Sequence, residues 1–160
     1  MNKPILTTFL RGISLYFYAT PLDDGRPDGP WVDVLNVLAL LPMSNMECAY
    51  IADAYRRDWF DLVQEVAADQ GRTLMLTPWL AAAPMVSAML HQLVAEDRIS
   101  QVALVGLWTI MEQSGQTASC VMAKARPDLF PQGMDSVDAA QEARWGAHLL
   151  REREPDGKPN

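Results

Sequence analysis

The feature that most constrains this chain is a long stretch with almost no charge. Between Thr73 and Ala123 only four of 51 residues carry a formal charge, and the other 29 of the 33 charged residues lie outside it. The four are Glu96, Asp97, Arg98 and Glu112. Charged side chains normally lie on the solvated surface. We therefore expect this middle third to be covered by other parts of the protein or by lipid.

Part of the charge-poor stretch is long enough to span a membrane. Residues 73–95 form a run of 23 residues without a formal charge, and about 20 apolar residues suffice for a spanning helix. The run also contains Pro78, Pro84, His91 and Gln92, and no cluster of Lys or Arg flanks it. These residues make it less hydrophobic than a typical spanning helix. We expect a buried core segment and not a membrane span.

The length and composition fit one globular domain. With 160 residues, of which 49% are apolar and 21% charged, the chain can bury a core of ordinary size. Arg11 interrupts the apolar run near the N-terminus, and no clear cleavage site follows it, so we predict no signal peptide. We expect a cytoplasmic protein with a single domain over residues 1–154 and a flexible polar tail over residues 155–160.

The net charge restricts the classes of partner. A formal charge of -7 disfavours nucleic acid and anionic membranes, which are bound through clustered Lys and Arg. A basic protein is the better match. Cys48 and Cys120 lie in apolar patterns without CxxC spacing, so we expect two buried thiols in a reducing compartment.

The clearest helix signal lies over residues 45–70. Ser44 and Glu47 have the spacing of a capping box, and Gly71 is the residue type that ends many helices. The segment is amphipathic at helical spacing. One predicted face carries Cys48, Ile51, Tyr55, Trp59, Leu62 and Val66, and the other carries Asp53, Arg57, Asp61, Gln64 and Glu65.

Further helix signals make an all-α fold the first expectation. We predict helices over residues 31–41, 84–97 and 100–114, and a last helix from Ser136 to about residue 154. The segment 21–30 holds three prolines, two glycines and three aspartates, which predicts a loop. The expected architecture is a single-domain bundle of about five to six helices, with the helices of the charge-poor third at its centre.

A small α/β domain is the alternative. Short apolar runs near residues 13–19, 73–77 and 101–107 would then be strands of a parallel sheet, alternating with helices. Periodicity alone cannot distinguish a short buried strand from a buried helical segment. Both architectures therefore stay open at the level of sequence.

Few residues fit a catalytic or metal-binding pattern. The sequence contains no HExxH, GxSxG, Walker A or GxGxxG motif. His91 is the one group in the charge-poor third that titrates near neutral pH, and this makes it a possible functional residue. Asp23, Asp24 and Asp28 share a loop, but two prolines break the spacing that a calcium loop needs. We predict no metal site and no cofactor.

These observations favour a binding protein over an enzyme. We expect a bacterial inhibitor, immunity-type or adaptor protein that contacts a basic partner protein through its acidic helix face. A second copy of the chain is another possible partner, through surplus apolar surface. The candidate contacts are Tyr50, Asp53, Tyr55, Asp58 and Asp61, together with Asp23, Asp24 and Asp28. The alternative is a small α/β enzyme with a site at strand ends near residues 77–79 and 106–108.

Overall fold

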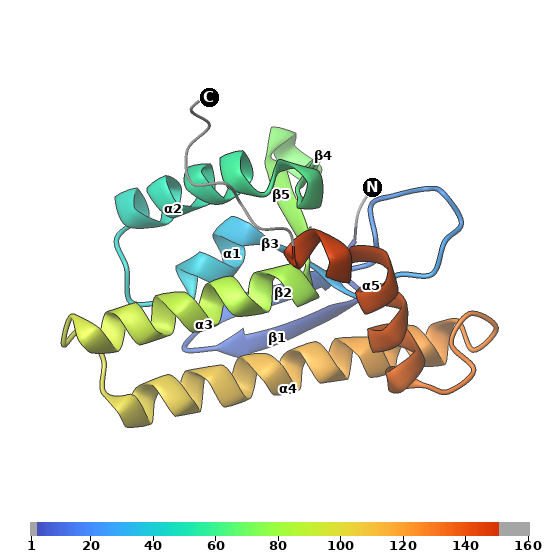
Figure 1. Cartoon of the computed structure of the whole chain (residues 1–160). Helices are drawn as coiled ribbons and strands as arrows, with labels where there is room; N and C mark the ends of the chain where they lie inside the picture. Colours follow the sequence, from blue (N-terminus) through green and yellow to red (C-terminus); the bar gives the residue numbers. More distant parts are fainter. Residues whose placement is uncertain (1–2, 151–160) are drawn as a thin grey trace, which may run out of the picture.

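The structure is a computed structural model that describes residues 3–150 as an antiparallel sheet covered by helices (Figure 1). Across the sheet the strand order is β1-β2-β3-β5-β4. The strands are β1 (Leu6–Leu10), β2 (Ile13–Tyr18), β3 (Trp31–Asp33), β4 (Gln64–Ala67) and β5 (Thr73–Pro78). The helices are α1 (Val34–Ala39), α2 (Asn45–Asp58), α3 (Trp79–Ala95), α4 (Gln101–Ala125) and α5 (Met134–Leu149). Two 3-10 helices, η1 (Phe60–Leu62) and η2 (Asp69–Gly71), flank β4.

The predicted all-α bundle is wrong, and the α/β alternative fits. The strands expected near residues 13–19 and 73–77 are present as β2 and β5. The strand expected at 101–107 is wrong, because these residues begin α4. The pairing also differs from the expected parallel sheet, since every strand pair is antiparallel. The tail predicted at 155–160 lies outside the described residues.

The predicted helix over residues 45–70 begins correctly and ends too late. Ser44 and Glu47 form the expected capping box, with hydrogen bonds of 3.2 and 2.7 Å. α2 ends at Asp58, however, and residues 64–67 form β4, which pairs with β5. Gly71 has the positive φ of 72° expected of a terminating residue, but it lies in the connection between two strands. Val66 fits the apolar face of a helix and a strand equally well, so periodicity could not distinguish a helix from a strand in this segment.

The two faces of the sheet pack against different elements. Phe17 and Val32 point into the larger core, which is built with α1, α2, α3 and α4. Trp31 points to the other face, where it packs with Leu62 of η1 and Trp145 of α5. Alternate residues of a strand point to opposite faces, so neighbours such as Trp31 and Val32 belong to different cores. The smaller core ties α5 and the loop before β3 to the sheet.

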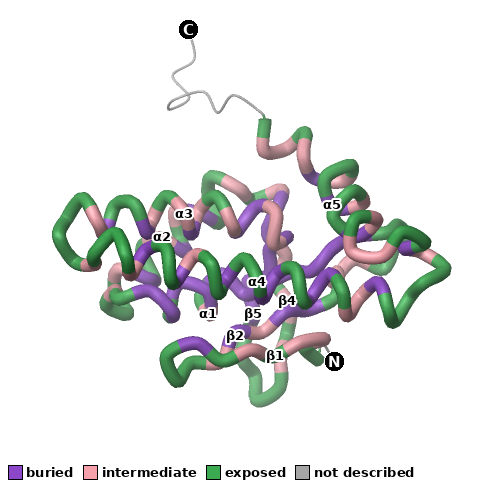
Figure 2. Tube along the Cα trace, turned by 90° about the horizontal axis from the view of Figure 1, so that it is seen from below, coloured by how far each residue is buried: buried purple, intermediate pink, exposed green. Residues whose placement is uncertain are grey.

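α4 is less central than the sequence predicted. Leu107 and Met111 face the core, whereas Val102 is 83% exposed and Val105 is 53% exposed. Figure 2 shows exposed residues along the length of this helix. Cys120, expected to be buried, is exposed on it, and both cysteines are free. None of the helices in residues 3–150 combines the length and apolarity needed to cross a membrane.

Candidate functional site

An apolar groove runs between α2 and α3. It consists of two cavities of about 370 and 350 Å³ that meet at Met89, which lines both. The first is lined by Met43, Glu47, Tyr50, Ile51, Ala54, Met89, Gln92, Leu93, Glu96 and Arg98. The second is lined by Tyr55, Trp59, Ala81, Pro84, Met85, Ala88, Met89 and Leu149. We call the two together the α2–α3 groove.

The sequence of α3 explains one wall of the groove. Val86 and Leu90 are fully buried in the core, and Met85 and Met89 precede them by one residue each. One residue is a turn of about 100° around a helix, so the two methionines lie beside the core-facing stripe and reach the groove. Ala88 adds little bulk between them. An almost wholly apolar helix can therefore pack on the core and still line a surface groove.

A charge pair closes one end of the groove. Arg98, in the turn between α3 and α4, donates hydrogen bonds to both carboxylate oxygens of Glu47 at 2.5 and 3.0 Å, and to the Pro42 carbonyl at 2.9 Å. The Arg98 guanidinium, together with the Ser44 backbone N–H, lowers the pKa of Glu47 to about 2. The pair joins the start of α2 to the end of α3 and so fixes the width of the groove at this end.

The surroundings of the groove combine exposed apolar side chains with an excess of acid. Tyr50 lines the groove and is 76% exposed, and Met46, one turn earlier, is 84% exposed. In the part of the chain that the structure describes, the carboxylates that line the groove are those of Glu47 and Glu96, and the one guanidinium group that lines it is that of Arg98. An apolar floor with an aromatic residue and a polar rim is the composition of protein-binding sites.

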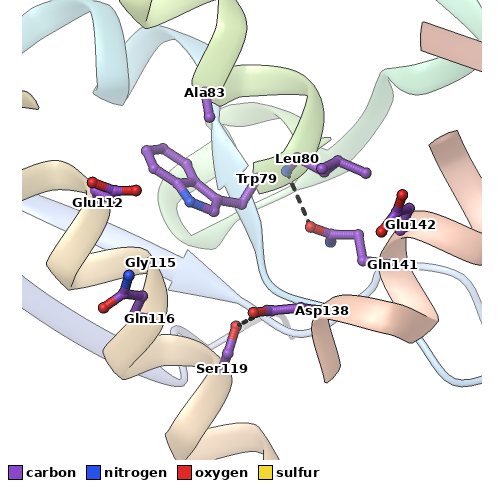
Figure 3. Close-up of a pocket in the computed structure, with 10 residues that line it drawn as sticks. All are labelled: Trp79, Leu80, Ala83, Glu112, Gly115, Gln116, Ser119, Asp138, Gln141 and Glu142. Carbon is purple, nitrogen blue, oxygen red and sulfur yellow. Dashed lines mark hydrogen bonds between the residues drawn. The ribbon is translucent and has the colours of Figure 1, made fainter. Parts of the chain in front are cut away.

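A second, polar cleft lies where α3, α4 and α5 meet (Figure 3). Its volume is about 270 Å³. Its lining is Trp79, Leu80, Ala83, Glu112, Gly115, Gln116, Ser119, Asp138, Gln141 and Glu142. Gln141 accepts a hydrogen bond from the Leu80 N–H at 3.0 Å, and Ser119 donates one to Asp138 at 2.9 Å. These bonds hold α5 against the start of α3 and against α4.

The cleft depends on a close approach between Trp79 and α4. A Cβ atom at Gly115 would lie 2.3 Å from the indole nitrogen of Trp79, so only glycine leaves room for the ring. The cleft is lined by three carboxylates, those of Glu112, Asp138 and Glu142, and is therefore negative. Residues 3–150 contain no group of three or more His, Cys, Asp or Glu side chains placed to hold a metal ion.

The candidate contact residues of α2 divide between surface and core. Tyr50 and Asp53 are exposed, as is Asp58, which lies 3.6 Å from Arg57. Tyr55 is buried, and its hydroxyl shares a hydrogen bond of 2.9 Å with Thr77 of β5. Asp61, in η1, shares a hydrogen bond of 2.8 Å with Nδ1 of His148 in α5. A partner that docks on α2 can therefore reach Tyr50, Asp53 and Asp58, whereas Tyr55 is only 6% exposed and lines the second cavity of the groove.

The three aspartates of the loop before β3 serve different purposes. Asp28 is buried and accepts hydrogen bonds from the indole N–H groups of Trp31 at 2.9 Å and Trp145 at 3.1 Å. Asp24 forms an ion pair with Arg144. The pKa of Asp24 is lowered, first by the hydrogen bond from the Arg26 backbone N–H and then by the Arg144 side chain. Asp23 is exposed. Asp28 therefore anchors the loop on α5, away from Tyr50 and Asp53 on α2.

The other predicted positions do not converge on one site. His91 is exposed on α3, and its Nδ1 makes a hydrogen bond of 2.7 Å with the Ser87 carbonyl. Trp79, expected at a strand end, does follow β5 and lines the polar cleft. Gly106 and Trp108 lie within α4 and not at the end of a strand. Of the two strand ends expected at 77–79 and 106–108, only the first is present, at the end of β5.

The sequence analysis missed the methionines of the groove. Met43, Met85 and Met89 line it, and the available signal was composition, since nine of the 160 residues are methionine. Methionine is flexible and polarisable and is common at surfaces that accept varied apolar partners.

Comparison of the chain with protein-family models, with curated proteins and with solved structures finds no match.

Proposed function

We propose that this protein is a non-enzymatic binding module whose α2–α3 groove holds an amphipathic helix of another protein. The observation that carries the proposal is the open apolar groove, lined by three methionines and by Tyr50 and Trp59. Grooves between two helices are a recurrent way to bind a partner helix through its apolar face. The carboxylates that line the groove are those of Glu47 and Glu96, and not those of the acidic helix face inferred from the sequence.

The groove has dimensions that suit a short helix. Its α3 wall extends from Ala81 to Leu93, a length of about 18 Å at 1.5 Å per residue. This corresponds to about three helical turns of a partner, with anchors at positions i, i+3 or i+4, and i+7. Tyr50 and Trp59 are the residue types that most often dominate such an interface.

The charge around the groove selects the flanks of the partner helix. Carboxylates outnumber guanidinium groups around it, and the whole chain carries -7. A helix with Lys or Arg beside its apolar stripe would meet complementary potential, and an acidic helix would be repelled. The partner is therefore expected to be a protein with a basic amphipathic helix, which this protein would inhibit or recruit by holding that helix.

A model peptide tests the proposal without knowledge of the natural partner. The probe is a fluorescein-labelled helical peptide of leucine and lysine, with leucines at i, i+3, i+4 and i+7, and its binding is followed by fluorescence anisotropy. We expect saturable binding that Tyr50→Ala and Met89→Glu each weaken by about tenfold or more. A matched peptide of leucine and glutamate should not bind.

The control variant is Val102→Glu, which adds a carboxylate at an exposed apolar residue of α4. It should bind the leucine-lysine peptide as the wild type does. Circular dichroism establishes that each variant is folded. Absence of saturable binding, or binding that Met89→Glu and Val102→Glu weaken equally, would contradict the proposal.

A further inference from the structure

The two edges of the sheet are protected to different degrees. β4, at one edge, has four residues, and its Glu65 pairs with Arg56 of α2 at 3.1 Å. β1, at the other edge, has the sequence LTTFL without a charge or a proline. Proteins usually protect a sheet edge with charge, proline, a bulge or a covering element. Figure 2 shows β1 at the margin of the molecule, and within residues 3–150 no strand pairs with its outer side.

The hairpin between β1 and β2 determines which backbone groups face outward. Arg11 and Gly12 both have positive φ, 53° and 77°, as in the two-residue turn that makes Leu10 and Ile13 a hydrogen-bonded pair. Bonded residues alternate along an antiparallel strand. The backbone N–H and C=O groups of Thr7 and Phe9 therefore point away from β2, toward the open edge.

We propose that β1 pairs with β1 of a second copy of the chain, antiparallel and centred on Thr8, so that two sheets join into one. In this register Thr7 lies opposite Phe9 of the second copy, and the reverse pair forms by symmetry. Both are residues with outward-facing backbone groups, so the two pairs make four hydrogen bonds. A two-fold axis through Thr8 satisfies both copies equally.

The side chains of β1 suit this register. Phe9 is 74% exposed in the single chain and would pack beside Thr7 of the second copy, which is a favourable aromatic and β-branched pair. Leu6 would lie opposite Leu10. Arg11 lies in the hairpin turn, beyond the residues that would pair. The pairing therefore places no like charges face to face.

The helix beneath β1 adds no charge to the proposed interface. α4 packs in the same core as Leu10 of β1. From residue 101 to 123 its only formal charge is Glu112, which lines the polar cleft beside α3 (Figure 3). Ile110 and Thr117 lie on the opposite flank of the helix, by the 100° spacing of its residues. Two copies with a charge of -7 each can thus approach along this side without placing carboxylates against each other.

Sedimentation velocity over a wide concentration series tests the dimer, because a five-residue strand pair is smaller than a standard interface and should dissociate on dilution. We expect the wild type to shift from monomer to dimer as the concentration rises. Phe9→Lys and Thr7→Pro should stay monomeric, the first by adding like charges and the second by removing an outward N–H. Phe60→Lys is the matched control, since Phe60 is 73% exposed elsewhere, and it should dimerise as the wild type does.

Cross-linking locates the axis independently. With Cys120→Ser in the background, Thr8→Cys should form an intermolecular disulfide, because residues opposite each other on the axis lie within disulfide reach. Phe9→Cys should cross-link several-fold more slowly. A wild type that is monomeric throughout, or a dimer that survives both Phe9→Lys and Thr7→Pro, would overturn the inference. Phe9→Lys should leave peptide binding in the α2–α3 groove unchanged, so this result is separable from the test of the groove.

Discussion

Two buried carboxylates, Asp28 before β3 and Asp33 at its end, are satisfied in different ways. Asp28 accepts hydrogen bonds from the Gly29 backbone at 2.7 Å and from the indoles of Trp31 and Trp145, and the Arg144 side chain lies 3.7 Å away. Asp33 accepts one from the Met75 N–H at 3.2 Å, with further backbone donors at Leu35 and Asn36. Its guanidinium partner, on the exposed Arg72, lies 3.8 Å away.

The surroundings of a buried carboxylate decide whether it stabilises this fold. A buried carboxylate is costly unless hydrogen-bond donors and an opposite charge surround it. Asp28 has such a shell and holds the loop, β3 and α5 together. At Asp33 burial outweighs the donors, and it raises the pKa of that carboxyl. One carboxylate is therefore an anchor, and the other is a local weakness at neutral pH.

The largest expected effect comes from removing the anchor. Asp28→Ala leaves two indole N–H groups and the Gly29 N–H without their acceptor, and it removes the carboxylate that lies 3.7 Å from the buried Arg144 guanidinium. It should lower the free energy of unfolding by about 3 to 5 kcal/mol. Urea denaturation followed by tryptophan fluorescence measures this. Asp24→Ala is the matched control, because Asp24 also pairs with Arg144 but is partly exposed. If Asp28→Ala and Asp24→Ala lowered the free energy of unfolding equally, Asp28 would stabilise the fold no more than the partly exposed Asp24 does.

A smaller and opposite effect is expected at the second carboxylate. Because the pKa of Asp33 is raised in the folded state, its contribution to stability is largest below the ordinary carboxyl pKa and is lost as pH rises through the folded value. Asp33→Asn keeps an acceptor for the Met75 N–H without the charge, and should raise the melting temperature at pH 7. The gain should vanish below about pH 4. Calorimetry of wild type and variant at both pH values measures this. A lower melting temperature for Asp33→Asn than for the wild type at pH 7 would contradict the contrast between Asp28 and Asp33.

The smallest effect is expected at an exposed carboxylate with good partners. The pKa of Glu47 is lowered to about 2 from 4.5, so its stabilising contribution is present above pH 4.5 and is lost as pH falls toward 2. Glu47→Gln should lower the melting temperature slightly at pH 7, because solvent screens an exposed pair. Wild type and variant should converge near pH 2. A constant difference across this range would show that the Arg98 charge contributes nothing.

Local signals in the sequence were the most reliable part of the prediction. The capping box of Ser44 and Glu47 and the cap at Ser100 are present as expected, since each depends on residues within one turn. Ser136 was predicted to begin the last helix, but α5 starts at Met134, and the Ser136 hydroxyl accepts a hydrogen bond from the Gln132 N–H at 2.8 Å. Boundaries therefore shifted by a few residues where a side chain had a second local partner.

The candidate site was predicted only in part. The exposed residues Tyr50, Asp53 and Asp58 follow from the amphipathic pattern of α2, whereas the burial of Tyr55 depends on Thr77, which lies 22 residues away. Met85 and Met89 read as core residues in a single sequence. They become groove residues because they line the space between α3 and α2, and no local pattern in α3 carries that information.

The sequence alone was sufficient for the N-caps at Ser44 and Ser100 and for the loop at 21–30, because these depend on near neighbours along the chain. That residues 31–33 and 64–67 are strands depended on the tertiary structure. Their hydrogen-bond partners are distant residues of β5, as in the pairs Trp31 with Pro78 and Val66 with Leu74. A strand is stabilised by its neighbours in the sheet, so a short segment acquires that identity only when the chain has folded around it.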